Sequence, residues 1–274
     1  MRRFLCLLVC VLVVTGCSDE PSPEPAGHTH SGGASVSLPV GDGTARYEVG
    51  YEMARVGLPE RAGTAGELTF RILYTGRAQT RFLFEQTKKM HVYVVRDDLA
   101  VFRHVHPEMT EDGTWKARLT LPSGGGYRVV AEFVAEDDGG NGDHLILGDT
   151  IYVAGTTTPA PKPPTRQADD GIVQAAVNGD GSVGEQGRLS ITVGRAGGGG
   201  VRLGTYLGTY AHLTGFAESG AMVHMHPLGS PEPDAGGSQL QFHSAFAQAG
   251  RYRLFVQVRV DGLVHTVPVA VTVR

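Results

Sequence analysis

Histidine is the residue type in this sequence that is best suited to do chemistry, because neutral imidazole is the commonest metal ligand in proteins. The motif His-x-His-Pro occurs twice, at residues 104–107 and 224–227. In a β-strand, residues i and i+2 point to the same face, so each motif places two imidazoles about 6–7 Å apart on one side of a sheet. Two imidazoles at that spacing can bind one metal ion, and the proline that follows ends the strand.

A third histidine precedes each motif and is predicted to complete a site of three imidazoles. A two-residue hairpin loop at residues 97–98 places His91 directly opposite His104 on the neighbouring strand. A three-residue loop around residues 218–219 brings His212 to the second motif in the same way. The predicted ligand sets are His91, His104 and His106 in the first half of the chain, and His212, His224 and His226 in the second half.

The last hairpin of the sequence adds a fourth candidate ligand. Residues 260–263 (VDGL) are a strong turn signal, and pairing across this turn places His265 opposite Val258, in an apolar row that faces inward. His144 is the approximate counterpart of His265 in the first half, so both residues are candidate metal ligands. His243 has no counterpart, and we expect it to face solvent.

The available donor types narrow the choice of metal. The three cysteines are Cys6, Cys10 and Cys17, so the rest of the chain cannot build the thiolate sites of structural zinc, iron–sulfur clusters or blue copper. Imidazole with a nearby thioether suits copper, and Met222 is expected on the same face as His224. Imidazole alone suits copper or zinc, and Met222 as a core filler is the alternative. We expect copper first and zinc second.

Two other interpretations of the histidines stay open. They could be hydrogen-bonded residues of a non-metal surface interaction or spacer module, although converging imidazoles lose solvation and repel one another when charged. Three histidines could also hold a hydrolytic zinc ion, but the sequence identifies no acid or base beside them. The sequence contains no Gly-x-Ser-x-Gly motif and no Walker-type loop, and its net charge of −4 offers no basic surface. We therefore expect no enzyme activity and no nucleic-acid binding.

The strands that carry these histidines belong to one unit that occurs twice. Corresponding residues such as Tyr127 and Tyr252 lie 120–125 positions apart. Each unit contains about seven short segments rich in β-branched or aromatic residues, which are typical of antiparallel strands. We predict an all-β fold of two tandem antiparallel β-sandwiches, immunoglobulin- or cupredoxin-like, at residues 44–155 and 168–274, with a Pro-rich linker at residues 156–167.

The first residues of the sequence indicate a targeting segment and not part of a folded domain. Residues 1–16 are predicted to be a signal peptide, because two arginines precede an apolar stretch of 11 residues that is too short to span a bilayer. The sequence VTGC resembles a bacterial lipobox, which predicts lipidation of Cys17. Residues 17–43 have the polar composition of a disordered tether, and its exposed His28 and His30 are not part of the predicted sites. We expect an extracytoplasmic protein held to the cell membrane only by its lipid anchor.

The repeated motifs also carry a resemblance to a known family. The segments MHVYVVRDDLAVFRHVHP and GGGYRVVAEFV, with MVHMHP and GRYRLFVQVRVDGLVHT in the second unit, resemble bacterial secreted proteins and lipoproteins built from β-sandwich repeats with an H-x-H-P motif. The resemblance covers nearly all of residues 44–274 and departs at the final hairpin of the first unit, near His144. It implies a surface module associated with heavy-metal and copper handling. A role in sequestering a metal ion, or in passing it to a membrane metal transporter or another surface protein, would follow.

Overall fold

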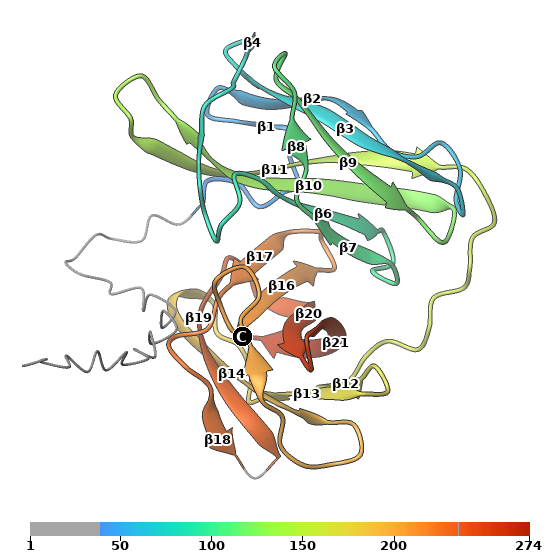
Figure 1. The fold of residues 1–274 in the computed structure, drawn as a ribbon, viewed down its shortest axis with the longest axis vertical. Helices are drawn as coiled ribbons and strands as arrows, with labels where there is room; N and C mark the ends of the chain where they lie inside the picture. Colours follow the sequence, from blue (N-terminus) through green and yellow to red (C-terminus); the bar gives the residue numbers. More distant parts are fainter. Residues whose placement is uncertain (1–38, 235) are drawn as a thin grey trace, which may run out of the picture. The chain divides into compact units, whose positions relative to one another are not determined.

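A computed structural model describes residues 39–234 and 236–274, which form β-strands and no helix. Two antiparallel β-sandwiches follow one another along the chain, as the sequence predicts (Figure 1). No helix that could cross a membrane occurs in the described residues. The signal peptide, Cys17, His28 and His30 lie outside the described residues.

The first sandwich consists of two sheets. One sheet has the spatial order β1 (Tyr47–Glu48), β2 (Tyr51–Gly57), β3 (Ala65–Tyr74), β9 (Thr114–Thr120) and β8 (Glu108–Met109), with β4 (Arg77–Ala78) also paired to β3. The other sheet has the order β11 (Gly142–Val153), β10 (Gly125–Glu136), β6 (His91–Arg96) and β7 (Phe102–Val105), with β5 (Phe82–Leu83) paired to β10.

The second sandwich repeats this arrangement. One sheet has the order β12 (Gln167–Asp169), β13 (Val173–Asn178), β14 (Gly184–Arg195), β19 (Gly237–Phe246) and β18 (Glu232–Asp234). The other has the order β15 (Leu203–Gly204), β20 (Gly250–Val260), β16 (Ala211–Ala217) and β17 (Met222–Met225), with β21 (Leu263–Val273) also paired to β20.

The first sandwich begins earlier than predicted. Val40 forms a parallel bridge with Leu145, in which the Val40 amide donates to the His144 carbonyl at 2.8 Å and the Ile146 amide donates to the Val40 carbonyl at 2.9 Å. Residues 39–43, which were expected to belong to the tether, are therefore part of the fold. A polar, glycine-rich composition did not reveal this because these contacts use backbone groups, which every residue carries.

Strand alternation fills the core of each sandwich. In β3, Leu68, Phe70 and Ile72 are fully buried, while the residues between them face outward. The alternate residues of β10 and β20 likewise complete one continuous apolar cluster in each sandwich. The sheets that contain the predicted ligands thus have one face committed to the core of their own domain.

The outer faces of these same sheets are also buried. All six residues of β6 and all seven of β16 are buried, so both strands are covered on both sides. A third apolar cluster explains this, because it combines residues of the two sandwiches, which belong to one compact unit. Phe102 of the first sandwich stacks on Phe255 of the second, with ring centroids 4.1 Å apart. The cluster comprises Tyr93, Val95, Val130 and Ile146 together with Phe216, Met222 and Phe255.

Candidate metal centre

The first histidine hairpin forms with a different turn from the predicted one. Tyr93, and not His91, lies opposite His104, and a four-residue turn at residues 97–100 joins the strands. The Arg96 amide donates to the Val101 carbonyl at 3.0 Å and closes this turn. The predicted two-residue loop is therefore wrong by two positions in register. An even shift preserves the side of the sheet, so His91 and His104 still share one face.

The second histidine hairpin has the predicted three-residue loop. The Ala217 amide donates to the Ala221 carbonyl at 2.9 Å, which leaves residues 218–220 as the loop. Thr214 then lies opposite His224, which is the equivalent of the pairing in the first domain.

The histidines of both motifs lie on the outer face of their sheets, and not on the inward face where the sequence places His265. Val92 and Val94, which alternate with the histidine row in β6, belong to the core of the first sandwich. His91 and Tyr93 consequently point to the outer face, toward the third apolar cluster. His212 lies on the corresponding outer face of β16, since its neighbours Ala211 and Leu213 fill the second core.

Site A, defined as His91, His104 and His106, brings three ring nitrogens together. His91 Nδ1 lies 3.1 Å from His104 Nε2, and His106 Nε2 lies 3.2 Å from the same His104 atom. Ligand nitrogens bound at about 2.0–2.1 Å to one tetrahedral ion are separated by about 3.3–3.4 Å. The three nitrogens of site A thus have nearly the spacing that a bound ion requires.

Site B, defined as His212, His224 and His226, repeats the geometry with the same atoms. His212 Nδ1 lies 3.3 Å from His224 Nε2 and 3.2 Å from His226 Nε2. In both sites the first histidine contributes Nδ1 and the two motif histidines contribute Nε2. The ligand atoms of each group lie within 4.8 Å of one another.

The hydrogen-bond partners of the outward ring nitrogens assign the tautomers. In site A, His91 Nε2 donates to the Glu85 carbonyl at 3.1 Å, and His104 Nδ1 donates to Gln257 Oε1 at 2.7 Å. A neutral imidazole carries one N–H, so the inward nitrogens of both rings carry lone pairs. These lone pairs face each other with no proton between them, an arrangement that a cation satisfies.

A backbone turn orients the first histidine of each site. Glu85 and Lys88 form a bridge around a tight turn, in which the intervening residues have positive φ angles of 42° and 67°. The Glu85 carbonyl at this turn receives the His91 N–H. The equivalent turn from Tyr206 to Thr209 supplies the Tyr206 carbonyl to His212 Nε2 at 3.1 Å. Such partners fix ring orientation and strengthen the ligand nitrogen.

The second partner of each site comes from the other sandwich. His224 Nδ1 of site B lies 2.7 Å from Glu132 Oε2, and both side chains are almost fully buried. The Tyr93 hydroxyl donates to the same carboxylate oxygen at 3.2 Å and lies 3.0 Å from His224 Nδ1. Gln257 of the second sandwich holds His104 of the first in the same manner. Neither cross-domain partner was predicted from the sequence.

Burial favours the neutral form of His91, His104, His106 and His212. Desolvation, followed by the neighbouring His224, lowers the pKa of His91 to about 4 and that of His212 to about 3. Burial and His91 lower the pKa of His106 to about 3. Desolvation also places the pKa of His104 well below its usual value. Near neutral pH these rings are therefore ready to act as metal ligands.

His144 is not the counterpart of His265, and it does not belong to either three-histidine site. It lies opposite Val134, whereas His265 lies opposite Val258, whose equivalent in the first domain is Phe133. His144 Nε2 lies 3.2 Å from Glu132 Oε1 and 3.2 Å from Glu85 Oε2. Burial lowers the pKa of His144, but the two carboxylates outweigh burial and raise it. His144 thus forms a third group with Glu85 and Glu132, whose ligand atoms lie within 4.8 Å of one another and could hold a metal ion.

His265 has the predicted strand pairing but the wrong face for the site. It faces inward opposite Val258, and its Nδ1 lies 2.7 Å from Asp170 Oδ2. Since site B occupies the outer face, His265 is separated from it by the sheet. His243 is exposed on β19, as predicted.

The methionines do not supplement the imidazoles as the sequence suggested. Met222 belongs to the apolar cluster between the sandwiches, with Phe216 and Phe255. Met225 lies in the second core and Met90 in the first. Met222 therefore acts as a packing residue, which was the alternative left open.

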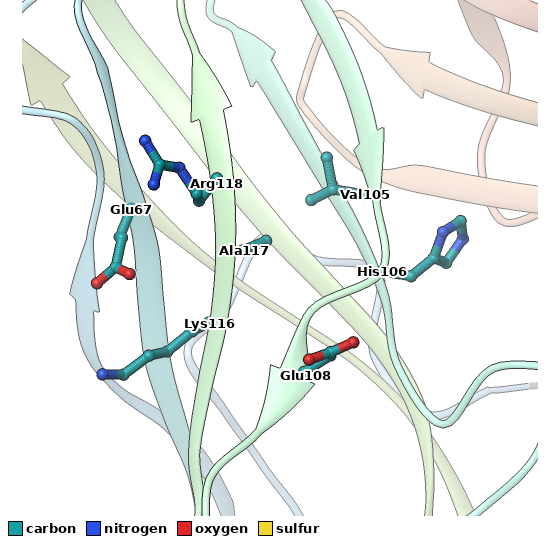
Figure 2. Close-up of a pocket in the computed structure, with 7 residues that line it drawn as sticks. All are labelled: Glu67, Val105, His106, Glu108, Lys116, Ala117 and Arg118. Carbon is teal, nitrogen blue, oxygen red and sulfur yellow. The ribbon is translucent and has the colours of Figure 1, made fainter.

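Site A borders an open pocket at its His106 side. The pocket has a volume of about 440 Å³. Figure 2 shows His106 directly after β7 at the edge of this pocket, with its ring turned away from Glu67, Lys116 and Arg118. His106 is thus the histidine of site A at the edge of an open pocket, while His91 is buried.

Comparison with known families finds two matches that coincide with the two sandwiches. A family model described as a domain of unknown function (DUF8832) matches residues 46–140 and 166–274. The matched segments contain all six histidines of sites A and B and omit His144. No curated protein matches the chain.

Solved structures show only a distant likeness. A Corynebacterium diphtheriae protein described as membrane anchored is 12% identical, with a TM-score of 0.23, over 81% of this chain. Invasin, a bacterial integrin-binding protein, is 14% identical with a TM-score of 0.21 over 82% of this chain. A DUF3823 family protein from Bacteroides uniformis is 12% identical with a TM-score of 0.22 over 73% of this chain. The aligned region spans 58%, 39% and 95% of those chains, respectively. Scores this low support no argument about function.

Proposed function

We propose that this chain, which belongs to the family described as a domain of unknown function (DUF8832), binds transition-metal ions at sites A and B. The proposal rests on the geometry of its own histidines. The observation that carries the proposal is that His91 Nδ1 and His104 Nε2 lie 3.1 Å apart and turn their lone pairs toward each other. Without a cation this arrangement is repulsive, and it recurs in site B with the equivalent atoms.

The ligand set favours copper over zinc. Three neutral imidazoles hold each ion, and copper(II) binds nitrogen ligands more tightly than zinc does in the general order of divalent metals. Copper(I) fits the site further, because a monovalent ion leaves less uncompensated charge in a buried place than a divalent ion does. Three protein ligands also leave a coordination position open, through which an ion can be exchanged.

The role that fits such sites is sequestration or handover of the metal outside the cytoplasm. The predicted signal peptide and the predicted lipidation of Cys17 would hold the two sandwiches at the cell surface. We expect an incoming ion, or a donor protein, to approach site A from the side of the open pocket that His106 borders. A membrane metal transporter is a suitable partner for this transfer, and the open coordination position is where the partner's ligand would bind.

Metal binding is tested with the tag-free chain from residue 18 onward. Equilibrium dialysis against copper and, separately, against zinc, followed by elemental analysis, should find two ions per chain with tighter binding of copper. Removing residues 18–38 should leave this stoichiometry unchanged, because His28 and His30 are not part of either site. Absence of bound metal in both dialyses would overturn the proposal and favour a surface module with a purely structural histidine cluster.

Membrane attachment is tested separately. Cys17→Ser should release the protein from the membrane fraction or leave it unprocessed, because the apolar stretch before it is too short to span a bilayer. Retention of the processed Cys17→Ser protein in the membrane would contradict the proposed lipid anchor.

A further inference from the structure

The two histidine sites adjoin each other across the contact between the sandwiches. The ring centroids of His91 and His224 are 5.9 Å apart, and those of His104 and His212 are also 5.9 Å apart. Within a single site, the centroids of neighbouring rings lie 4.4–5.6 Å apart. The separation between the sites is thus only slightly larger than the separation within them.

The distances also show that the sites are related by an approximate two-fold axis. The first histidines of the two sites, His91 and His212, are 6.3 Å apart, and so are the second histidines, His104 and His224. Both crosswise distances are equal as well, at 5.9 Å. Two sandwiches of the same fold therefore present the same outer face to each other, with the histidines meeting at the axis.

We propose that sites A and B form a single two-metal centre shared by the two sandwiches, in which the two bound ions interact directly. This inference rests on the proposed function, since it requires an ion in each site. Each ion takes three imidazoles from one domain, and each imidazole set is oriented by a residue of the other domain, Glu132 for His224 and Gln257 for His104. In two-metal sites of proteins, ions are typically about 3.5–4 Å apart.

The charges around the centre specify what else it binds. Six neutral imidazoles supply no negative charge, and among the described residues Glu132 is the carboxylate in contact with the ligand histidines. The nearby carboxylates of Glu132 and Glu85 are both already paired with His144. Two divalent ions therefore lack compensation in a buried place, which favours a small bridging anion such as hydroxide in the open positions of the two ions. Two copper(I) ions need less compensation and can do without the bridge.

The direct test is electron paramagnetic resonance of the tag-free chain titrated with copper(II) sulfate. The first equivalent should give an ordinary mononuclear spectrum. The second equivalent should give a half-field transition, or a loss of more than half of the intensity expected for two spins, because neighbouring copper(II) ions couple. His226→Ala, which removes one site B ligand, should bind one equivalent and show neither effect, whereas exposed His243→Ala should behave as the parent.

The outcomes separate this inference from the proposed function. Two bound copper ions with the full intensity of two spins and no half-field transition would overturn the shared centre and leave two independent metal sites. A chain that binds no copper would overturn both. Binding of two ions with coupled spins in the parent, and of one uncoupled ion in His226→Ala, would establish the centre.

Discussion

Glu132 and Gln257 occupy equivalent positions of the two sandwiches, and each reaches across to a histidine of the other. Glu132 lies opposite His91 in its own sheet, and Gln257 lies opposite His212 in the same relation. Yet Glu132 holds His224 and Gln257 holds His104, both at 2.7 Å. The repeats therefore exchange their supporting residues, and the supporting group differs in type: site B has a carboxylate where site A has an amide.

The first prediction uses this difference. Glu132→Gln should lower the metal affinity of site B by about 10–100-fold, because a partner that orients a ligand and raises its basicity is removed or weakened. Site A should be less affected, because its partner is Gln257. Competition with a chromophoric copper(I) chelator would measure both affinities.

The matched change is Gln257→Glu, which gives site A the carboxylate that site B already has. It should raise the copper affinity of site A while lowering the stability of the metal-free chain, since it buries a charge. Equal affinities in the parent and in both variants would show that these residues do not support the ligands.

The second prediction compares three histidines of one domain. His224→Ala or His226→Ala should reduce the metal affinity of site B at least about tenfold, since each removes a ligand and the loss of even a supporting partner commonly has an effect of this size. His243→Ala should leave the affinity unchanged, because this exposed residue lies on β19 in the other sheet. Melting curves with and without copper would report the three effects together. Equal metal-induced stabilisation of all three variants would contradict the assignment of site B.

The third prediction concerns pH. Unfolded histidines titrate near pH 6.5, whereas burial lowers the folded pKa of His91 to about 4 and that of His106 to about 3. Between pH 6.5 and pH 4 the unfolded metal-free chain binds more protons than the folded chain does. The free energy of unfolding should therefore fall as the pH decreases from 6.5 toward 4. Above pH 6.5 these groups should contribute no slope. Urea titrations at several pH values would measure it.

The same pKa values predict when metal is released. Ligands must be neutral to bind, so copper at site A should remain bound at pH 5 and dissociate only as the pH approaches about 4. An exposed imidazole would release the metal near pH 6.5. Release centred there would mean that the bound ion is held by exposed histidines and not by the buried clusters.

The sequence predicted the grouping of the histidines better than their surroundings. Alternation along a strand determines which residues share a face of the sheet. A change of strand register by an even number of residues leaves these faces unchanged, so His91 and His104 share a face although the turn predicted at residues 97–98 is incorrect. Alternation alone cannot show which face of a sheet points to the core of its own domain when both faces are buried. The unbroken apolar run from Val92 to Val95 in β6 is the sequence signal that this strand is covered on both sides, and it is consistent with the contact between the sandwiches.

The supporting residues could not be predicted in the same way. Glu132 and His224 are 92 positions apart and belong to different domains, so their contact depends on how the domains pack. His265 shows the converse: its pairing with Val258 was correct, but its partner Asp170 comes from a loop 95 residues away. The register between neighbouring strands follows from the local sequence pattern, whereas the packing of one folded domain on another does not.

The last prediction tests whether domain packing supports the metal sites. Phe255 is 4% exposed and stacks on Phe102 between the sandwiches. Phe255→Ala should destabilise the chain by roughly 3 kcal/mol, as the loss of a buried aromatic side chain does. It should also weaken copper binding at both sites, because each site takes an orienting residue from the opposite domain. Phe84→Ala makes the same change at a side chain that is 71% exposed, and it should alter stability by less than about 0.5 kcal/mol with no effect on copper. Calorimetry and chelator competition on both variants would measure these effects. A destabilised Phe255→Ala chain with parental copper affinity at both sites would show that each domain assembles its site alone.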